Sequence, residues 1–331
     1  MSNLFKPLLI IAAASFSATT ALAQPQGLAQ PSHNGEASYL LSTTQQTTSE
    51  LPNNVAAILQ TLPEDTVIGI AVLDKQGRLV FHHNSQRELP TASAIKSFLL
   101  FELFAHYGSE LDRERRTDIS AILKNKKHPA IAHFGQAHQQ EIVDELQHIS
   151  IKQLGSIMID STDRAGKPYS NIVYNAAANV AIALLGGPSA TTVSVQQRHD
   201  AFRKVHFRRY MLARRNVTGD NTATPVALAT LFQSTLNQTS KGSHPNIVRE
   251  FANILLARDY PNGDKLYAKG GTLYSDPVTQ VRSGQYRSGE TAMNYAIMAH
   301  QKLKTKTSGK QQHEKLKKLT LAIYTGLQNP D

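Results

Sequence analysis

The sequence of 331 residues contains no cysteine and no tryptophan, and aromatic residues make up only 7% of it. Without cysteine, the chain can neither form a disulfide nor carry the lipid anchor of a lipoprotein. After the N-terminal segment no apolar run approaches the length of a membrane span. We also find no internal repeat. These absences predict a soluble chain without disulfides, lipid anchor or membrane-spanning helix.

The formal net charge is +10, which raises the question of a nucleic-acid partner. The basic residues are dispersed along the chain, however, aromatic residues are few, and no nucleic-acid-binding motif is present. We therefore expect no nucleic-acid partner. An anionic surface of the cell envelope or an anionic substrate fits the charge better.

The N-terminus has the pattern of a secretory signal. Lys6 precedes an apolar run from Leu8 to Ala14, and Ala21-Leu22-Ala23 stands before Gln24. We expect residues 1–23 to be a signal peptide cut after Ala23, and the protein to be periplasmic or secreted. Residues 24–50 are rich in Gln, Ser and Thr and predict a flexible segment. Residues 51–331 are long enough for one domain of two lobes.

The pattern of apolar residues predicts strands and helices at both ends of this domain and a largely helical middle. The fold class that follows is α/β (α+β), with an antiparallel sheet flanked by helices and a second, all-helical lobe. The expected elements are a helix at Leu51–Leu62, a hairpin of Thr66–Leu73 and Arg78–His82, a glycine-interrupted strand at Lys265–Leu273, a strand at Asn294–His300 and a helix at Glu314–Leu327.

One stretch, Leu89–Phe104, combines apolar residues at helical spacing with Ser93 and Lys96. Pro90 and Thr91 predict a helix start, which puts Ser93 in the first turn and Lys96 on the same helical face. A lysine desolvated in an apolar site can take the proton of a serine hydroxyl and make it a nucleophile. The alternative is a capping serine beside a lysine that reaches for solvent.

Two further segments predict ordered structure. Asn175-Ala-Ala-Ala-Asn179 opens a small-residue helix that Gly186 and Gly187 close. The loop Thr218–Pro225 leads into a helix capped by Thr224. Histidines recur at intervals of five at His128, His133 and His138, but this spacing turns them off a common helical face. We therefore expect no metal site among them.

Taken in order, Ser93-x-x-Lys96, the Asn175-Ala-Ala-Ala-Asn179 helix and Lys269-Gly-Gly-Thr-Leu273 resemble the penicillin-recognising serine hydrolases, and most of all the class A β-lactamases. The resemblance covers nearly all of residues 51–331. It implies an active site between the two lobes, a small-molecule β-lactam or peptidoglycan-like substrate, no cofactor and a monomer.

The resemblance also implies roles for single residues. Ser93 would be the acylated nucleophile and Lys96 its proton acceptor. Lys269 would hold a substrate carboxylate, and Asn175 would donate to the acyl-amide carbonyl of the substrate. The backbone amides of Ser93 and Thr272 would form the oxyanion hole, with Gly271 beside them at the substrate. The alternatives are a solvated surface lysine at Lys269 and a purely structural Asn175.

The first departure from the family pattern lies in its middle motif, Ser-Asp-Asn. Here Thr162-Asp163 stands for the first two residues, and Arg164–Tyr174 is inserted before Asn175. Two positions before Asn175, where the family has a proton-shuttling serine, stands Val173. The candidates to replace that serine are Thr162, Ser161 and Ser170.

The second departure is Gly270, where the family usually has Thr or Ser, so a hydroxyl that helps bind the substrate carboxylate is missing. Thr272 could compensate, and Arg282 or Arg287 could add positive charge.

The third departure concerns the loop before the Thr-Pro helix, where class A β-lactamases have a glutamate that activates the deacylating water. From Ala201 to Gly219 this chain has no Asp or Glu. Asp200 and Asp220 flank the gap. Slow deacylation is therefore expected, unless Lys96 or another group activates the water. The loop instead carries six basic residues, Arg203, Lys204, Arg208, Arg209, Arg214 and Arg215.

We interpret the chain as a periplasmic acyl-enzyme serine hydrolase that acts on β-lactams or a similar amide or ester. The first alternative is a D-alanyl-peptidase-like, penicillin-binding enzyme, which the missing glutamate favours. The second is a non-catalytic binding domain of the same fold.

Overall fold

The structure is a computed structural model that describes residues 51–113, 117–162, 166–214, 219–237, 244–305 and 307–328. The expected signal peptide and the Gln/Ser/Thr-rich segment lie outside these residues, and both remain predictions. The described residues all belong to one unit, which clusters over Thr47–Asp331.

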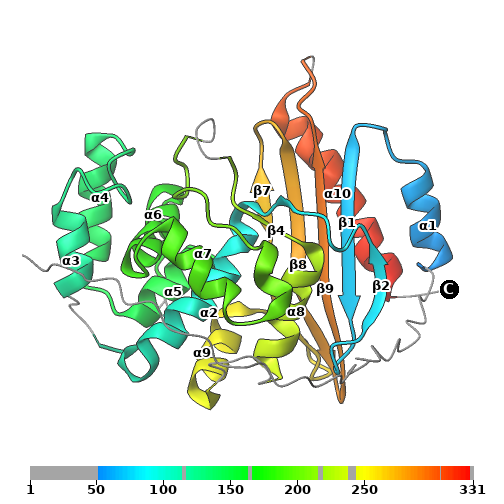
Figure 1. Cartoon of the computed structure of the whole chain (residues 1–331), viewed down its shortest axis with the longest axis horizontal. Helices are drawn as coiled ribbons and strands as arrows, with labels where there is room; N and C mark the ends of the chain where they lie inside the picture. Colours follow the sequence, from blue (N-terminus) through cyan, green and yellow to red (C-terminus); the bar gives the residue numbers. More distant parts are fainter. Residues whose placement is uncertain are drawn as a thin grey trace, which may run out of the picture. The chain divides into compact units, whose positions relative to one another are not determined.

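An antiparallel sheet forms one half of this unit, with strand order β2-β1-β9-β8-β6-β5 and with β7 also paired to β8 (Figure 1). A separate pair, β3 and β4, joins the segment before Ser93 to the segment before the Thr-Pro helix. The strands are β1 (Thr66–Leu73), β2 (Leu79–His83), β3 (Leu89–Pro90), β4 (Thr222–Ala223), β5 (Leu256–Asp259), β6 (Lys265–Ala268), β7 (Gly271–Leu273), β8 (Val278–Ser288) and β9 (Thr291–Gln301).

Helices cover both faces of the sheet, which explains why β1 is an almost continuous apolar run rather than an alternating one. The terminal helices α1 (Asn53–Gln60) and α10 (Gly309–Gln328) pack on one face, where Ile70 and Ile323 share a fully buried cluster. Helix α8 (Pro225–Leu236) covers the opposite face and belongs to the larger core.

The remaining helices form the second lobe, and α2 runs through its centre with nine consecutive buried residues from Lys96 to Phe104. Small alanines on α6 let this helix pack closely against α2 and α5. The helices of the lobe are α2 (Lys96–Tyr107), α3 (Thr117–Lys124), α4 (Gln136–Leu146), α5 (Ile151–Asp160), α6 (Asn171–Leu184), α7 (Pro188–Gln196) and α9 (Pro245–Leu255), with short 3₁₀ turns η1 (Ala92–Ile95), η2 (Gly108–Glu110) and η3 (Asp200–Lys204).

The α+β fold class expected from the sequence is confirmed, with its antiparallel sheet, flanking helices and helical lobe. Two local expectations were wrong by about one helical turn. Ser93 lies in the 3₁₀ turn η1 rather than in an α-helix, and α6 begins at Asn171 instead of Asn175 because Ser170 caps it by accepting from Val173 N at 3.2 Å. Thr224 caps α8, with Pro225 at its first position, as expected.

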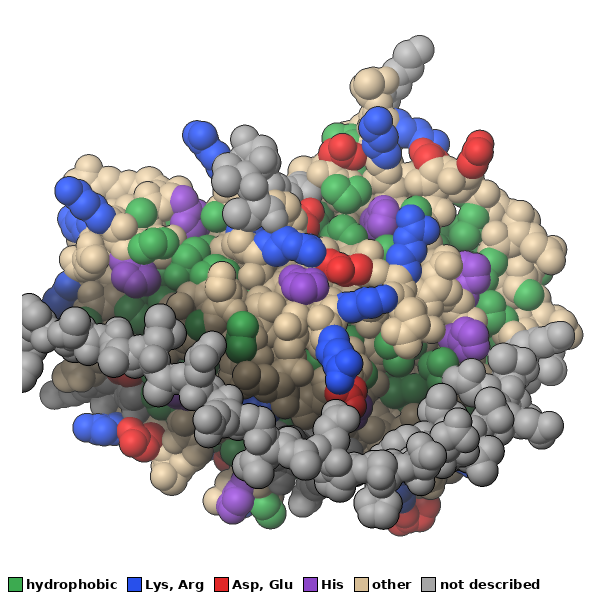
Figure 2. Space-filling model, viewed as in Figure 1, with side chains coloured by type: hydrophobic (Ala, Val, Ile, Leu, Met, Phe, Trp, Pro, Cys, Tyr) green, Lys and Arg blue, Asp and Glu red, His purple; other side chains and the backbone are tan. Residues whose placement is uncertain are grey.

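On the face drawn in Figure 2, Lys and Arg side chains are scattered among acidic and uncharged ones. By length and apolar character, no single described helix would span a membrane, although α6 and α7, bent by 72° at their junction, pass that test as a pair.

Candidate active site

The 3₁₀ turn η1 holds Ser93 at the junction of the two lobes. Ala92, just before it, has a φ of 49°, a left-handed conformation that is rare for residues other than glycine and that marks stored strain. The backbone N–H of Lys96 donates to Ser93 O, so the two residues are one turn apart on one face. Ser93 lines an open cavity, and the fully buried Lys96 lies behind it in the protein interior.

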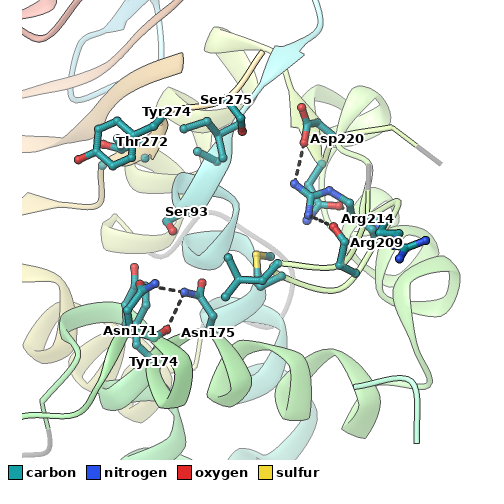
Figure 3. A pocket seen from close by; sticks show the side chains of 18 residues that line it. Ser93, Asn171, Tyr174, Asn175, Arg209, Arg214, Asp220, Thr272, Tyr274 and Ser275 are labelled. Atoms are coloured by element: carbon teal, nitrogen blue, oxygen red, sulfur yellow. Dashed lines mark hydrogen bonds and ion pairs between the residues drawn. The ribbon is translucent and has the colours of Figure 1, made fainter. Parts of the chain in front are cut away.

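The cavity has a volume of about 800 Å³ and is bordered by the helical lobe on one side and by β7 on the other (Figure 3). Ser93 lies between these walls. The lining residues are Ala92, Ser93, Asn171, Tyr174, Asn175, Arg209, Met211, Leu212, Ala213, Arg214, Asp220, Asn221, Gly270, Gly271, Thr272, Leu273, Tyr274 and Ser275.

Lys96 is fully buried, and its Nζ donates to Asn175 Oδ1 at 3.1 Å and to Tyr174 O at 3.3 Å. The same Nζ lies 3.2 Å from the centroid of the Tyr174 ring. Burial, and secondarily the positive charge of Lys269, lower the pKa of Lys96 well below its usual value. A neutral amine at this position can accept a proton from the neighbouring serine hydroxyl.

The backbone of β7 packs directly on η1, which brings Thr272 beside Ser93. A Cβ on Gly271 would lie 2.3 Å from Thr91 O and 2.9 Å from Ala94 N, so only glycine fits there. Lys269 N donates to Ser283 O on β8 at 3.0 Å, so Lys269 belongs to a hydrogen-bonded pair. Hydrogen-bonded and non-hydrogen-bonded pairs alternate along an antiparallel ladder, and Thr272, three residues further on, therefore falls in a non-hydrogen-bonded pair. Its N–H therefore points away from β8, toward the edge that faces η1.

Lys269 lies near Lys96 but behind the cavity wall. Its Nζ donates to Ile159 O at the end of α5 and lies 5.1 Å from the centroid of the Tyr174 ring. Burial raises the pKa of Asp160, and the charge of Lys269 opposes this shift. The structure thus brings the two predicted lysines to one tyrosine ring.

Asn175 lies in the cavity wall, and its Nδ2 donates to Asn171 O at 2.8 Å. Thr162 is not among the lining residues, since it pairs with Pro168 in a short bridge at the base of the inserted loop. Asp163 lies outside the described residues. Ser170 caps α6, Ser161 Oγ donates to Asp160 O at 2.5 Å, and neither lines the cavity.

The structure does not bring Arg282 or Arg287 to the cavity. Arg282 follows Val281, which faces the core, so its side chain projects from the other face of the sheet, where Nε donates to Thr320 on α10 at 3.2 Å. Arg287 lies further along β8, in a separate hollow beside Asn237.

The loop after η3 contributes Met211 and the carboxylate of Asp220 to the cavity. Asn179 on α6 clamps the backbone of Met211, with Oδ1 accepting from Met211 N at 2.5 Å and Nδ2 donating to Met211 O at 3.1 Å. The carboxylate of this loop that lines the cavity, Asp220, is held by Arg209 at 2.7 Å, with both side chains about nine-tenths buried. A paired carboxylate is poorly suited to activate water.

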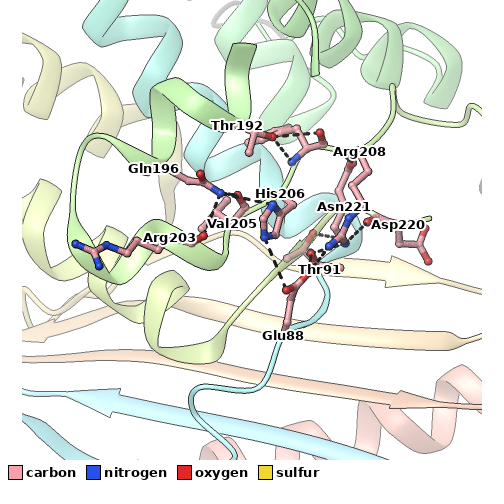
Figure 4. A network of polar contacts seen from close by, with 12 residues as sticks. Glu88, Thr91, Thr192, Gln196, Arg203, Val205, His206, Arg208, Asp220 and Asn221 are labelled. Atoms are coloured by element: carbon pink, nitrogen blue, oxygen red, sulfur yellow. Dashed lines mark hydrogen bonds and ion pairs between the residues drawn. The ribbon is translucent and has the colours of Figure 1, made fainter. Parts of the chain in front are cut away.

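A polar network anchors the same loop to the strand before Ser93 (Figure 4). Glu88 accepts hydrogen bonds from Thr222 and Arg208. Burial raises the pKa of Glu88, but these two hydrogen bonds together with the charges of Arg208 and His206 outweigh it and keep the pKa below its usual value. Asn221 Oδ1 accepts from the backbone N–H of Arg208 at 2.8 Å. The loop is therefore fixed against β3 and β4.

The three histidines singled out in the sequence serve separate local contacts. His133 Nε2 lies 2.9 Å from Met211 O, His128 Nδ1 accepts from Ala130 N, and His138 faces Glu141. Within the described ranges, no group of three or more His, Asp or Glu side chains is arranged to hold a metal ion.

Sequence reasoning missed three contributors to the site, Tyr174, Asn179 as a loop clamp, and the Arg209–Asp220 ion pair. Tyr174 stands directly before Asn175, and this adjacency was the available signal. The contact of Asn179 with Met211 joins segments about 30 residues apart, and the Arg209–Asp220 ion pair closes a loop on itself, so neither gives a local signal in the sequence.

No family model matches the sequence, and no curated protein matches it. Solved structures do match over most of both chains. A β-lactamase from Burkholderia vietnamiensis is 19% identical, with a TM-score of 0.57 over 83% of this chain and 98% of the other. The TLA-1 extended-spectrum β-lactamase is 13% identical, with a TM-score of 0.58 and the same coverage. A variant of the last common ancestor of Gram-negative class A β-lactamases is 18% identical, with a TM-score of 0.54 over 82% of this chain and 98% of the other.

At these identities the likeness concerns the fold and not the activity. The chain therefore has the fold of the class A β-lactamases.

Proposed function

We propose that the protein is a serine hydrolase that opens β-lactams, or a similar amide or ester, through an acyl-enzyme on Ser93, and that it hydrolyses this intermediate slowly. One observation carries the proposal. Ser93 opens to the cavity, and one turn behind it lies a fully buried lysine whose pKa is lowered.

In the acylation step, Lys96 Nζ takes the proton of the Ser93 hydroxyl while Oγ bonds to the substrate carbonyl carbon. The carbonyl oxygen becomes an oxyanion that accepts from the backbone amides of Ser93 and Thr272. When the tetrahedral intermediate collapses, the carbon–nitrogen bond breaks and the leaving nitrogen takes the proton that Lys96 Nζ had accepted from Ser93. Asn175, whose amide lines the cavity, holds the acyl part of the substrate.

Deacylation requires a base that removes a proton from water. The loop beside Ser93 offers Met211 at the cavity, and Asp220 is engaged by Arg209. The acyl-enzyme is therefore long-lived. This favours the penicillin-binding, D-alanyl-peptidase-like alternative over a fast β-lactamase.

The test mixes the purified mature protein with benzylpenicillin and follows intact mass together with the loss of lactam absorbance, with Ser93→Ala as the control. We expect a persistent adduct of one acyl group that Ser93→Ala abolishes. A transient adduct with sustained, Ser93-dependent lactam loss would instead establish a turning-over β-lactamase. No adduct and no lactam loss would favour a binding domain or a non-lactam substrate.

We also propose that residues 1–23 direct export to the periplasm or the medium. Cell fractionation followed by N-terminal sequencing tests this, and a mature protein that begins at Gln24 in the exported fraction is the expected result.

A further inference from the structure

The surroundings of Lys96 lack the partner that a buried ammonium ordinarily needs. Its Nζ has two oxygen acceptors, Asn175 Oδ1 and Tyr174 O, and otherwise faces the Tyr174 ring. No ion pair joins Lys96 to a carboxylate in the part of the chain that the structure describes. The charged group that acts on it is Lys269, of the same sign.

A neutral Lys96 is well suited to this environment, but the acylation step makes it an ammonium. A buried cation without a counter-charge is costly, and the cost falls on the step in which the serine proton arrives. An aromatic ring face carries negative electrostatic potential and attracts cations within about 6 Å of its centroid, most strongly where water is excluded. The Tyr174 ring, at 3.2 Å from Nζ, meets this condition.

We propose that the ring face of Tyr174 is the counter-charge for Lys96 and stabilises the ammonium formed when Lys96 accepts the Ser93 proton. The proposal rests on the proposed function and names a positioning residue for it. It is the ring, and not the phenol hydroxyl, that performs this role. No bond to Tyr174 is made or broken, since the proton moves from Ser93 Oγ to Lys96 Nζ.

The other groups around Lys96 set the background against which the ring acts. From η1, Ser93 supplies the proton. From the segment between β6 and β7, Lys269 opposes protonation of Lys96 and lies 5.1 Å from the same ring. From α5, Asp160 lies close enough to Lys269 for the lysine charge to lower its pKa, against the larger effect of burial. The ring thus counteracts burial and Lys269, which both lower the pKa of Lys96.

The test varies the electron density of the ring without changing its shape. Phenylalanine and its mono-, di- and trifluoro derivatives are placed at position 174, since fluorine withdraws charge from the ring face while the packing stays nearly constant. The pKa of Lys96 is read directly by NMR of ¹³Cε-labelled lysine, with the signal assigned by its loss in Lys96→Met. The rate of acylation by benzylpenicillin is measured as a function of pH in the same variants.

We expect Tyr174→Phe to keep the wild-type pKa of Lys96, and the pKa to fall stepwise with fluorination, by about one unit for the trifluoro variant. The acid limb of the acylation profile should move to lower pH by the same amount, because the neutral amine is the reactive form. The same series at Tyr260, whose ring faces Arg258 at 5.4 Å, is the matched control and should leave Lys96 unchanged.

A Lys96 pKa that is constant across the fluorinated series overturns the proposal. So does a Tyr174→Phe variant that loses acylation while the pKa of Lys96 stays constant, because the hydroxyl would then be the active group. Failure of the proposed function looks different: the NMR titration still responds to fluorination, but benzylpenicillin labels neither the wild type nor the variants.

Discussion

Gly271 offers the most direct test of how the sheet and the nucleophile turn fit together. A Cβ added at this position would lie 2.3 Å from Thr91 O, 2.9 Å from Ala94 N and 3.0 Å from Ala92 Cβ. The first two are backbone atoms, so no side chain can rotate away, and Gly271→Ala must push β7 off η1. Overpacking of this kind costs about 1–3 kcal/mol of folding stability.

The functional cost should be larger than the stability cost. The displacement carries the Thr272 amide away from the oxyanion position, and losing one such donor lowers the rate by about 10²–10³. The matched control is Gly270→Ala, where the added Cβ meets Val281 O at 3.1 Å and the neighbour needs to move only slightly.

The assay combines urea denaturation with the second-order rate constant for acylation of Ser93 by benzylpenicillin. We expect Gly271→Ala to remain folded and to acylate at least tenfold more slowly than Gly270→Ala. If the two variants acylate at the same rate, the contact between β7 and η1 does not position the oxyanion hole, and our assignment of Thr272 fails.

Three further predictions concern buried charges. Glu102 is 1% exposed and accepts two bonds from Arg198 at 2.8 Å, so Glu102→Gln should lower the free energy of unfolding by about 3 kcal/mol, measured in urea; a loss below about 0.5 kcal/mol would contradict this. The folded-state pKa of Lys96 is lowered from 10.5, so between the two pKa values the unfolded state binds more protons and stability rises with pH. The unfolding free energy of the wild type should therefore rise by up to about 1.4 kcal/mol per pH unit more steeply than that of Lys96→Met, and parallel curves would refute the shift. Asp220→Asn leaves Arg209 buried without its partner and should lower the melting temperature by several degrees in calorimetry, whereas an unchanged value would mean that the ion pair does not hold the loop.

Much of the fold could be predicted from the sequence because its signals are local. Thr224 and Pro225 define the start of α8 through capping chemistry that involves neighbouring residues only. The apolar run Thr66–Leu73 reads as a strand without any knowledge of its partners. Ser93 and Lys96 are three residues apart, so their common orientation follows from the turn itself.

The rest of the site depends on contacts that no local pattern fixes. Which face of β8 carries Arg282 depends on strand register, and a shift of one residue reverses it. Tyr174 lies inside α6, which starts one turn before the Asn175 start that the small-residue pattern predicted, and its contact with Lys96 joins two helices. The clamp of Asn179 on Met211 joins two segments whose pairing is a property of the folded lobe.

The measurement that tests the central claim most directly is the lifetime of the Ser93 acyl-enzyme after excess benzylpenicillin is removed, followed by intact mass in the wild type and in Met211→Glu. Our account predicts a persistent adduct in the wild type and faster loss in Met211→Glu, which adds a carboxylate to the cavity wall besides Asp220, the one held by Arg209. A wild-type adduct that disappears as fast as it forms, or no adduct at all, would contradict it.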